Sequence, residues 1–208
     1  MLVSLLAAAA LAAPAHGFQV ARPLHALALR SSPGGAVVAR VGSRTPFGSP
    51  LVLGVGARRG RWVGLISSAL PNGRLGWADR RRLRFQDVRY AISVDLSRRE
   101  LVLRHGGLVV RRVTVAIGRP SSPTPTGRFT VTDKLAGGAL ARVYGCCILA
   151  LSGHQPHPPP GWRGEARLAI HAGSMAGAVS AGCLHAPERD LRFLIATVPL
   201  GTPVRIRP

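Results

Sequence analysis

Short apolar runs separated by turn-forming residues mark the first part of the chain, and they restrict its fold more than any other feature. The runs at residues 36–39, 50–55 and 62–66 are too short for helices but suit strands. Glycine, proline and asparagine recur between the runs, where they favour turns. We therefore predict a small all-β unit over residues 24–84. The turn segments are 32–35, 46–48, 58–61 and 71–73.

The remainder of the chain, residues 88–208, has a similar strand-like rhythm. Apolar and polar residues alternate from Ile92 to Leu96, and segments 101–103 and 108–117 complete a predicted three-strand meander. The fold class that we predict is mainly β: a small β-barrel followed by a β-rich domain with one or two short helices. Later predicted elements are a buried strand at 144–152, a short helix at 187–195 and a last strand at 204–206.

The first fifteen residues have the features of a secretory signal peptide. The apolar run at 2–11 is too short for an ordinary transmembrane span, and Ala13-Pro14-Ala15 is similar to an A-x-A cleavage site. A positively charged start is missing, so the true start could lie upstream, the segment could remain as an anchor, or it could be a buried helix. Since no later segment reaches transmembrane length, we expect no integral membrane domain and an extracytoplasmic location: secreted, cell wall or periplasmic space.

A histidine and a cysteine stand at the two ends of a flexible segment rich in Gly, Ala and Ser. His171 follows the apolar run 168–170, and Cys183 comes after eleven intervening residues, behind Ser180 and Gly182. A thiol needs a base to become the thiolate that attacks an acyl group, and small residues let the backbone approach a carbonyl. The amides of Gly182 and Cys183 could then bind an oxyanion. On pattern alone, a loop with a buried core thiol is the simpler interpretation.

These residues resemble the active-site signature of the L,D-transpeptidase (YkuD-type) family. In that signature an apolar strand ends in His, and a variable loop leads to Ser-x-Gly-Cys and an apolar residue. The matching segments here are 170–171 and 180–184. Segments 123–129, 190–191 and 198–204 are also similar to the family, so the resemblance covers about the last 120 residues, and we assign residues 88–208 to a catalytic domain of this type.

The first unit is similar to a bacterial SH3-like barrel, in which an Arg-Trp-Val strand and a later Gly-Trp-Ala strand recur. The corresponding segments are 61–63 and 76–78. This resemblance implies a module that accompanies wall enzymes and could bind peptidoglycan. Trp62 and Trp77 could equally be residues of the barrel core.

The chain departs from the family pattern in four places. Ala172 stands where Gly usually follows the histidine, Ala181 where His or Asn is frequent, and His185 where Arg usually follows the cysteine motif. The loop between His171 and Cys183 is also short. The departures affect substrate contacts, above all the carboxylate or stem-peptide contact that the Arg supports.

The resemblance implies an exported peptidoglycan L,D-transpeptidase. Cys183 would attack the third residue of a stem tetrapeptide with His171 as base, D-Ala would leave, and a neighbouring stem amine would resolve the thioester into a 3→3 cross-link. Water as acceptor would give an L,D-carboxypeptidase, and an amine on a lipoprotein would give an anchoring enzyme. No metal or organic cofactor is required, and carbapenems are an inhibitor class of the family. The alternative is a non-catalytic cell-wall-binding protein with a degenerate transpeptidase domain.

Further residues are assigned supporting roles at this site. Gly182 would help to bind the oxyanion, and either the Ser180 side chain or the carbonyl at Ala172 would orient the imidazole. The loop at 118–129 borders the cleft in the family. The predicted substrate-binding residues are His185, His154, Thr126 and Gly127.

The charge of the chain restricts its partners. The formal net charge is +20 and Lys134 is the single lysine, a composition that favours high-GC coding bias as its origin, with attraction to anionic wall polymers as a by-product. No nucleic-acid motif accompanies the charge and aromatic residues make up 5%, so we predict no nucleic-acid partner. We expect a monomer that acts on peptidoglycan stem peptides.

Two other patterns involve cysteine. Four histidines and Cys183 could be drawn as a zinc site, but the prolines make an irregular loop, no acidic partner is near, and a zinc-bound Cys183 could not act as nucleophile. We therefore predict no metal. Cys146 and Cys147 are adjacent, and because a bond between neighbours is strained and rare, we predict two core thiols. The histidines are His154, His157, His171 and His185.

Overall fold

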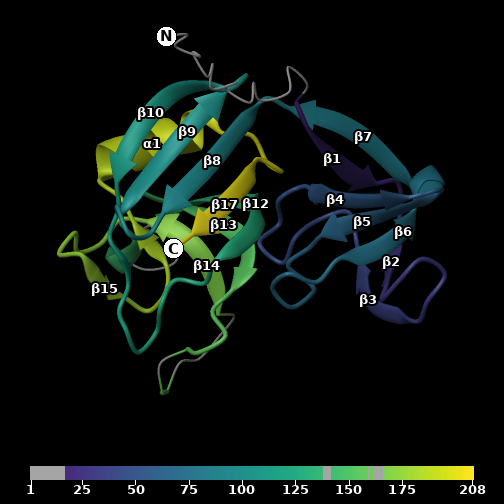
Figure 1. The fold of residues 1–208 in the computed structure, drawn as a ribbon, viewed down its shortest axis with the longest axis horizontal. Helices are drawn as coiled ribbons and strands as arrows, with labels where there is room; N and C mark the ends of the chain where they lie inside the picture. The colour runs from purple at the N-terminus through teal and green to yellow at the C-terminus, as the bar shows by residue number, and fades with distance from the viewer. Residues whose placement is uncertain (1–16, 138–141, 159, 162–165) are drawn as a thin grey trace, which may run out of the picture.

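The computed structural model describes residues 17–137, 142–158, 160–161 and 166–208, which form two β-sheet units lying side by side (Figure 1). The mainly β fold predicted from the sequence is confirmed, with one α-helix among the described residues. The predicted signal segment, residues 1–15, lies outside them. No helix in the described part of the chain is long and apolar enough to cross a membrane.

The first unit is an antiparallel sheet of seven strands in the order β3-β2-β6-β5-β4-β1-β7. Strand β1 lies before residue 24 and pairs with β7, so the sheet begins earlier than the predicted unit. Its core includes Leu29, Leu53, Val63 and Leu65. The strands are β1 (Phe18–Pro23), β2 (Leu27–Arg30), β3 (Val37–Val41), β4 (Leu53–Arg59), β5 (Trp62–Ile66), β6 (Gly76–Asp79) and β7 (Leu83–Val88), with a 3-10 turn at Arg80–Arg82.

The second unit is a sheet of eight strands in the order β10-β9-β8-β17-β12-β13-β14-β16. The predicted meander corresponds to β8, β9 and β10. Parallel pairing occurs between β17 and β8 and between β14 and β16. The strands are β8 (Tyr90–Asp95), β9 (Glu100–His105), β10 (Leu108–Thr114), β12 (Gly127–Ala136), β13 (Cys147–His154), β14 (Arg167–His171), β16 (Leu184–His185) and β17 (Pro203–Arg207). Outside this sheet, β11 (Ile117–Gly118) pairs with β15 (Ala178–Ser180).

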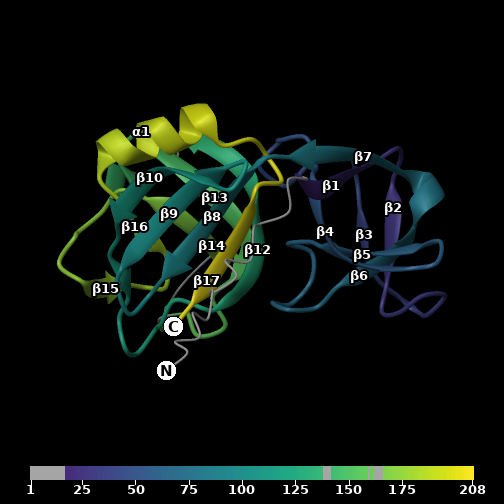
Figure 2. The ribbon, with the colours of Figure 1, turned by 45° about the horizontal axis from the view of Figure 1, so that its top comes forward.

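One face of the second sheet is covered by helix α1 (Glu188–Thr197), as Figure 2 shows. Leu191 and Leu194 of the helix are fully buried against the core that contains Leu149 and Ile170. Side chains alternate between the two faces of a strand, so the residues beside these core positions, such as His171, lie on the opposite face. We call this opposite face the outer face; it carries the candidate site.

The first unit packs against the outer face through specific contacts. The side-chain amide of Asn72 forms two hydrogen bonds with the backbone of His154. The Asn72 Nδ2 donates to the His154 carbonyl at 2.7 Å, and the His154 backbone amide donates to Asn72 Oδ1 at 2.8 Å. The Thr45 hydroxyl donates to the buried Asp133. The apolar cluster of Val20, Val52 and Val88 extends this contact to residues of the second unit. The two units therefore share an ordered interface.

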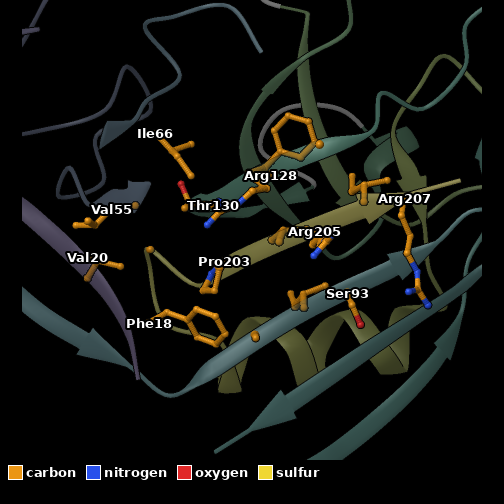
Figure 3. A pocket seen from close by; sticks show the side chains of 18 of the residues that line it. Phe18, Val20, Val55, Ile66, Ser93, Arg128, Thr130, Pro203, Arg205 and Arg207 are labelled. Carbon is orange, nitrogen blue, oxygen red and sulfur yellow. The ribbon is translucent and has the colours of Figure 1, made fainter. Parts of the chain in front are cut away.

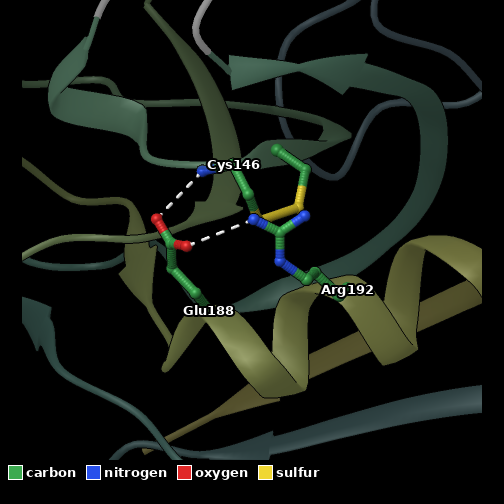
Figure 4. The surroundings of a disulfide bond; sticks show 4 residues. Cys146, Glu188 and Arg192 are labelled. Atoms are coloured by element: carbon green, nitrogen blue, oxygen red, sulfur yellow. Dashed lines mark hydrogen bonds and ion pairs between the residues drawn. A yellow bond between two sulfur atoms is a disulfide. The ribbon is translucent and has the colours of Figure 1, made fainter.

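The prediction of two free thiols at Cys146 and Cys147 is wrong, because the structure joins them in a disulfide (Figure 4). Cys146 lies in the turn between the 3-10 helix Arg142–Tyr144 and β13, whereas Cys147 is the first residue of the strand. Because Cys146 precedes the strand, the strand rule that sends neighbouring side chains to opposite faces does not apply to this pair. The Glu188 carboxylate of α1 accepts a hydrogen bond from the Cys146 backbone amide at 3.1 Å and forms an ion pair with Arg192 at 3.5 Å. The helix is therefore linked directly to this turn.

Candidate active site

Parallel pairing of β14 and β16 brings the predicted histidine and cysteine to the outer face. The register aligns Ile170 with Leu184 and His171 with His185. Cys183, the residue before β16, therefore lies beside Ala169. Ala169 and His171 are two residues apart in β14, so their side chains point to the same face of the sheet. The strand register thus puts Cys183 on the chain segment next to the strand that carries His171.

His171 is held in one orientation and is uncharged at neutral pH. Its side chain is 5% exposed, its Nδ1 lies 2.5 Å from the Ala172 carbonyl oxygen, and the ring of Tyr144 meets it edge-on at 4.8 Å. Because a carbonyl can only accept, we assign the ring proton to Nδ1, which leaves Nε2 as a base. Burial lowers the pKa of His171 to about 4, aided by the nearby His185 and opposed by the bond to Ala172.

Cys183 is a protonated thiol at rest. Burial raises its pKa to about 11, although a backbone contact with Ala169 acts in the other direction. The thiol donates to the Arg167 carbonyl oxygen at 3.8 Å, and within the described residues no hydrogen bond joins it to His171. Proton transfer from thiol to imidazole therefore requires the Cys183 side chain to turn away from Arg167.

A tight turn at Ser180 to Cys183 presents the thiol. The buried Ser180 hydroxyl donates to the Cys183 carbonyl at 2.5 Å and accepts the Gly182 amide at 3.0 Å. Gly182 has φ +116°, a backbone conformation that residues other than glycine rarely adopt. Of the two predicted orienting groups, the Ala172 carbonyl contacts the imidazole, whereas Ser180 closes the turn. The Gly182 amide, predicted to bind an oxyanion, donates its hydrogen bond to the Ser180 hydroxyl in this structure.

The predicted substrate-binding residues lie in three different places. His185 is beside His171, with ring centroids 4.8 Å apart, and its Nδ1 lies 2.9 Å from the Ser174 carbonyl. His154 lies in the contact between the two units, where its Nε2 is 2.7 Å from the Ser68 carbonyl. Thr126 and Gly127 line a hollow between the units. The structure thus brings only His185 to the imidazole.

That hollow has a volume of about 900 Å³, but it is not the candidate site (Figure 3). Neither Cys183 nor His171 lines it. Basic side chains of β12 and β17 border it on one side and apolar side chains of the first unit on the other. The labelled examples are Arg128, Arg205, Arg207, Phe18, Val20 and Val55.

Three residues of the site were missed by the sequence analysis. Tyr144 contacts the His171 ring, Arg167 provides the carbonyl for the thiol, and the side chain of Gln155 contacts the turn at Ala181. The Pro-rich stretch around Gln155 suggested an irregular loop, and no local pattern distinguishes these three residues. Among the described residues, no group of three or more His, Cys, Asp or Glu side chains is arranged to hold a metal ion.

A β-rich domain that displays a thiol and a neutral imidazole on one sheet face defines the class of this protein. The family model described as the L,D-transpeptidase catalytic domain, YkuD, matches residues 89–206, and the chain belongs to this family.

Two curated relatives and a solved structure are similar to the chain. A provisionally named L,D-transpeptidase YkuD of Bacillus licheniformis is 30% identical over 127 residues, which cover 58% of this chain and 67% of the relative. Its counterpart in Bacillus subtilis strain 168 is 30% identical over 125 residues, with 57% and 66% covered. The chain thus spans about two thirds of these relatives. An L,D-transpeptidase structure from Mycobacterium tuberculosis H37Rv is 18% identical, with 67% of each chain covered and a TM-score of 0.46.

Proposed function

We propose that the protein is an exported peptidoglycan L,D-transpeptidase that forms 3→3 cross-links through a Cys183 thioester. The observation that carries this proposal is the bond from His171 Nδ1 to the Ala172 carbonyl, which leaves Nε2 as a base on the face that also holds Cys183. Such an oriented base beside a thiol is the minimal arrangement for cysteine acyl transfer. The family assignment supplies the substrate class, a peptidoglycan stem peptide.

Acylation begins with two neutral groups. The pKa values of about 11 for Cys183 and about 4 for His171 disfavour an ion pair before substrate binds. We infer that the thiol turns from the Arg167 carbonyl toward Nε2 and loses its proton as sulfur attacks the carbonyl of the third stem residue. The electron pair of the C=O bond moves to oxygen, where the Cys183 amide is the proposed donor. Removal of one such donor costs about 3 kcal/mol in measured cases.

Collapse of this intermediate releases D-Ala. The C–N bond breaks, the imidazolium returns its proton to the leaving amine, and the acyl group remains on sulfur as a thioester. In the second half-reaction a stem amine loses a proton to His171 and attacks the thioester, which restores the thiol and forms the cross-link. Water in place of the amine gives L,D-carboxypeptidase activity. Our proposal includes a monomeric protein in the extracytoplasmic space, with anionic wall polymers as further contacts.

The second candidate function is non-catalytic wall binding. It is favoured by the resting geometry of Cys183, whose raised pKa and bond to Arg167 describe an unreactive thiol. In that case the first unit, which we propose to be an SH3-like module, would hold the wall ligand. The two candidates differ in whether Cys183 ever becomes acylated.

Intact-protein mass spectrometry with a disaccharide-tetrapeptide decides between them. An acyl adduct that lacks D-Ala, present in the wild type and missing in Cys183→Ala, is the expected result. The released products would name the acceptor, stem amine or water. Wild-type protein with reduced Cys183 that forms no adduct and releases no D-Ala would exclude the enzyme and favour wall binding.

A further inference from the structure

The side chain of Gln155 joins three separate segments around the cysteine turn. It is buried, at 6% exposure, and its Nε2 donates to the carbonyl oxygens of Pro123 and Ala181, both at 3.0 Å. Its Oε1 accepts the His157 amide at 3.1 Å. Two acceptors at one end and a donor at the other define the orientation of the amide. All of its polar hydrogens are used, so this is a satisfied buried network.

Gln155 also fills the space next to Gly182. A Cβ at Gly182 would overlap Nε2 of Gln155, so the glutamine amide occupies the place that a side chain at this turn would need. Cys183 is the next residue along the chain. The Gln155 amide therefore limits how far the backbone carrying the nucleophile can move, through one hydrogen bond and direct packing.

The backbone at Gln155 is fixed by both units. Its amide donates to the Ala166 carbonyl at 2.7 Å. The preceding residue, His154, is held by Asn72 of the first unit through the two hydrogen bonds described above and through its own ring to Ser68. Contacts thus run without interruption from the loop between β5 and β6 to the cysteine turn.

We propose that Gln155 is a positioning residue for the Cys183 turn and that Asn72 of the first unit supports it. This inference rests on the proposed acyl transfer and assigns a role in it to the first unit. The turn contains the amide proposed to bind the oxyanion, and misplacement of such a group by about 1 Å lowers catalysis by about 100-fold in measured cases. A polar side chain that only completed the fold would stabilise the protein without affecting oxyanion geometry.

The test compares two reactions of the same thiol. Acylation by a carbapenem passes through an oxyanion, whereas alkylation by iodoacetamide requires only the thiolate. Replacement Gln155→Glu keeps the shape but places a carboxylate against two carbonyl oxygens. We expect its second-order acylation rate constant to fall about 10- to 100-fold at pH 7. Alkylation should change less than about threefold, since the thiol itself is untouched.

Acidification provides a second signature. Protonation of the introduced carboxyl restores one O–H donor toward the Ala181 or Pro123 carbonyl. The ratio of the acylation rate of Gln155→Glu to that of the wild type should therefore rise between pH 7 and pH 5. The matched control is Gln86→Glu, the same chemical change on the exposed face of β7, which should leave both reactions unchanged.

A second variant keeps the proposal testable if Gln155→Glu does not fold. Asn72→Asp retains the acceptor for the His154 amide but removes the donor to its carbonyl. It should slow acylation about 3- to 10-fold, with unchanged alkylation, because its effect is transmitted through Gln155.

The outcomes separate the two claims. A wild type that the carbapenem and the stem peptide both fail to acylate would overturn the proposed function and this inference together. Acylated wild type with equal rates in folded Gln155→Glu and Asn72→Asp would overturn the inference alone. Faster alkylation in parallel with slower acylation would show loss of the fold around Cys183 and would also contradict a specific positioning role.

Discussion

Acidification below pH 6.5 tests the buried, neutral state of His171 through the stability of the protein. The ordinary pKa of histidine is 6.5 and the pKa of His171 is about 4, mainly because burial disfavours the charged ring. Between these two pH values the unfolded chain binds a proton at this position and the folded protein does not. The free energy of unfolding should therefore fall as pH is lowered through this window.

The magnitude follows from the two pKa values of His171. They are separated by about two and a half pH units, and each unit corresponds to about 1.4 kcal/mol, so the loss should approach about 3 kcal/mol at pH 4. Above pH 6.5 the ring is unprotonated in both the folded and the unfolded state, and below pH 4 it is protonated in both, so this residue should contribute no further pH dependence there.

Urea denaturation at several pH values between 7.5 and 4 measures this effect. The matched comparison is His171→Gln, which cannot titrate, so the difference between the two proteins removes the other ionisable groups. We expect the wild type to lose about 3 kcal/mol more than the variant over this window. Parallel curves for the two proteins would refute a buried imidazole with a depressed pKa.

Three further predictions concern the Cys183 thiol, a buried ion pair of the helix and the turn beside Ala172. Alkylation of Cys183 by iodoacetamide should increase with an inflection near pH 11, and a profile centred near pH 9 would indicate an exposed thiol, as read by mass spectrometry. Arg111→Ala removes the shorter of two ion pairs of the buried Asp190, at 2.6 Å, and leaves Arg189 at 3.6 Å; it should lower the free energy of unfolding by about 1–3 kcal/mol in urea titrations, and an unchanged midpoint would contradict this. Gly145→Ala, at φ +66°, would overlap the Cβ of Ala172 and should destabilise the protein by about 1–3 kcal/mol, which a lowered Tm would register and an equal Tm would disprove.

Part of the candidate site is readable in the chain because its geometry is local. His171 follows an apolar run that is too short for anything but a strand, and Ser180 and Gly182 form a turn within a few residues. The Ala172 carbonyl is adjacent in sequence to the imidazole that it orients. Neighbour relations of this kind depend on backbone conformation over two to four residues, which composition and spacing constrain strongly.

The residues that were missed act across long separations. Gln155 meets Ala181 from 26 residues away, and Asn72 meets His154 from another unit. The disulfide between Cys146 and Cys147 was missed for a different reason, since it depends on where β13 begins within one residue. Strand ends are set by pairing with partners elsewhere in the chain, which spacing alone does not reveal.

The sequence by itself determined a mainly β chain with two units and a thiol and imidazole near the ends of one short segment, because strand length, turn residues and acyl-transfer chemistry are local properties. Only the tertiary structure decided that His171 is buried, that Cys183 is half-buried, that both are neutral, and that the thiol rests against the Arg167 carbonyl. It also decided that the first unit contacts the sheet face carrying them, through Asn72. Burial and charge state depend on every element packed around a group, so they emerge only when the chain is folded.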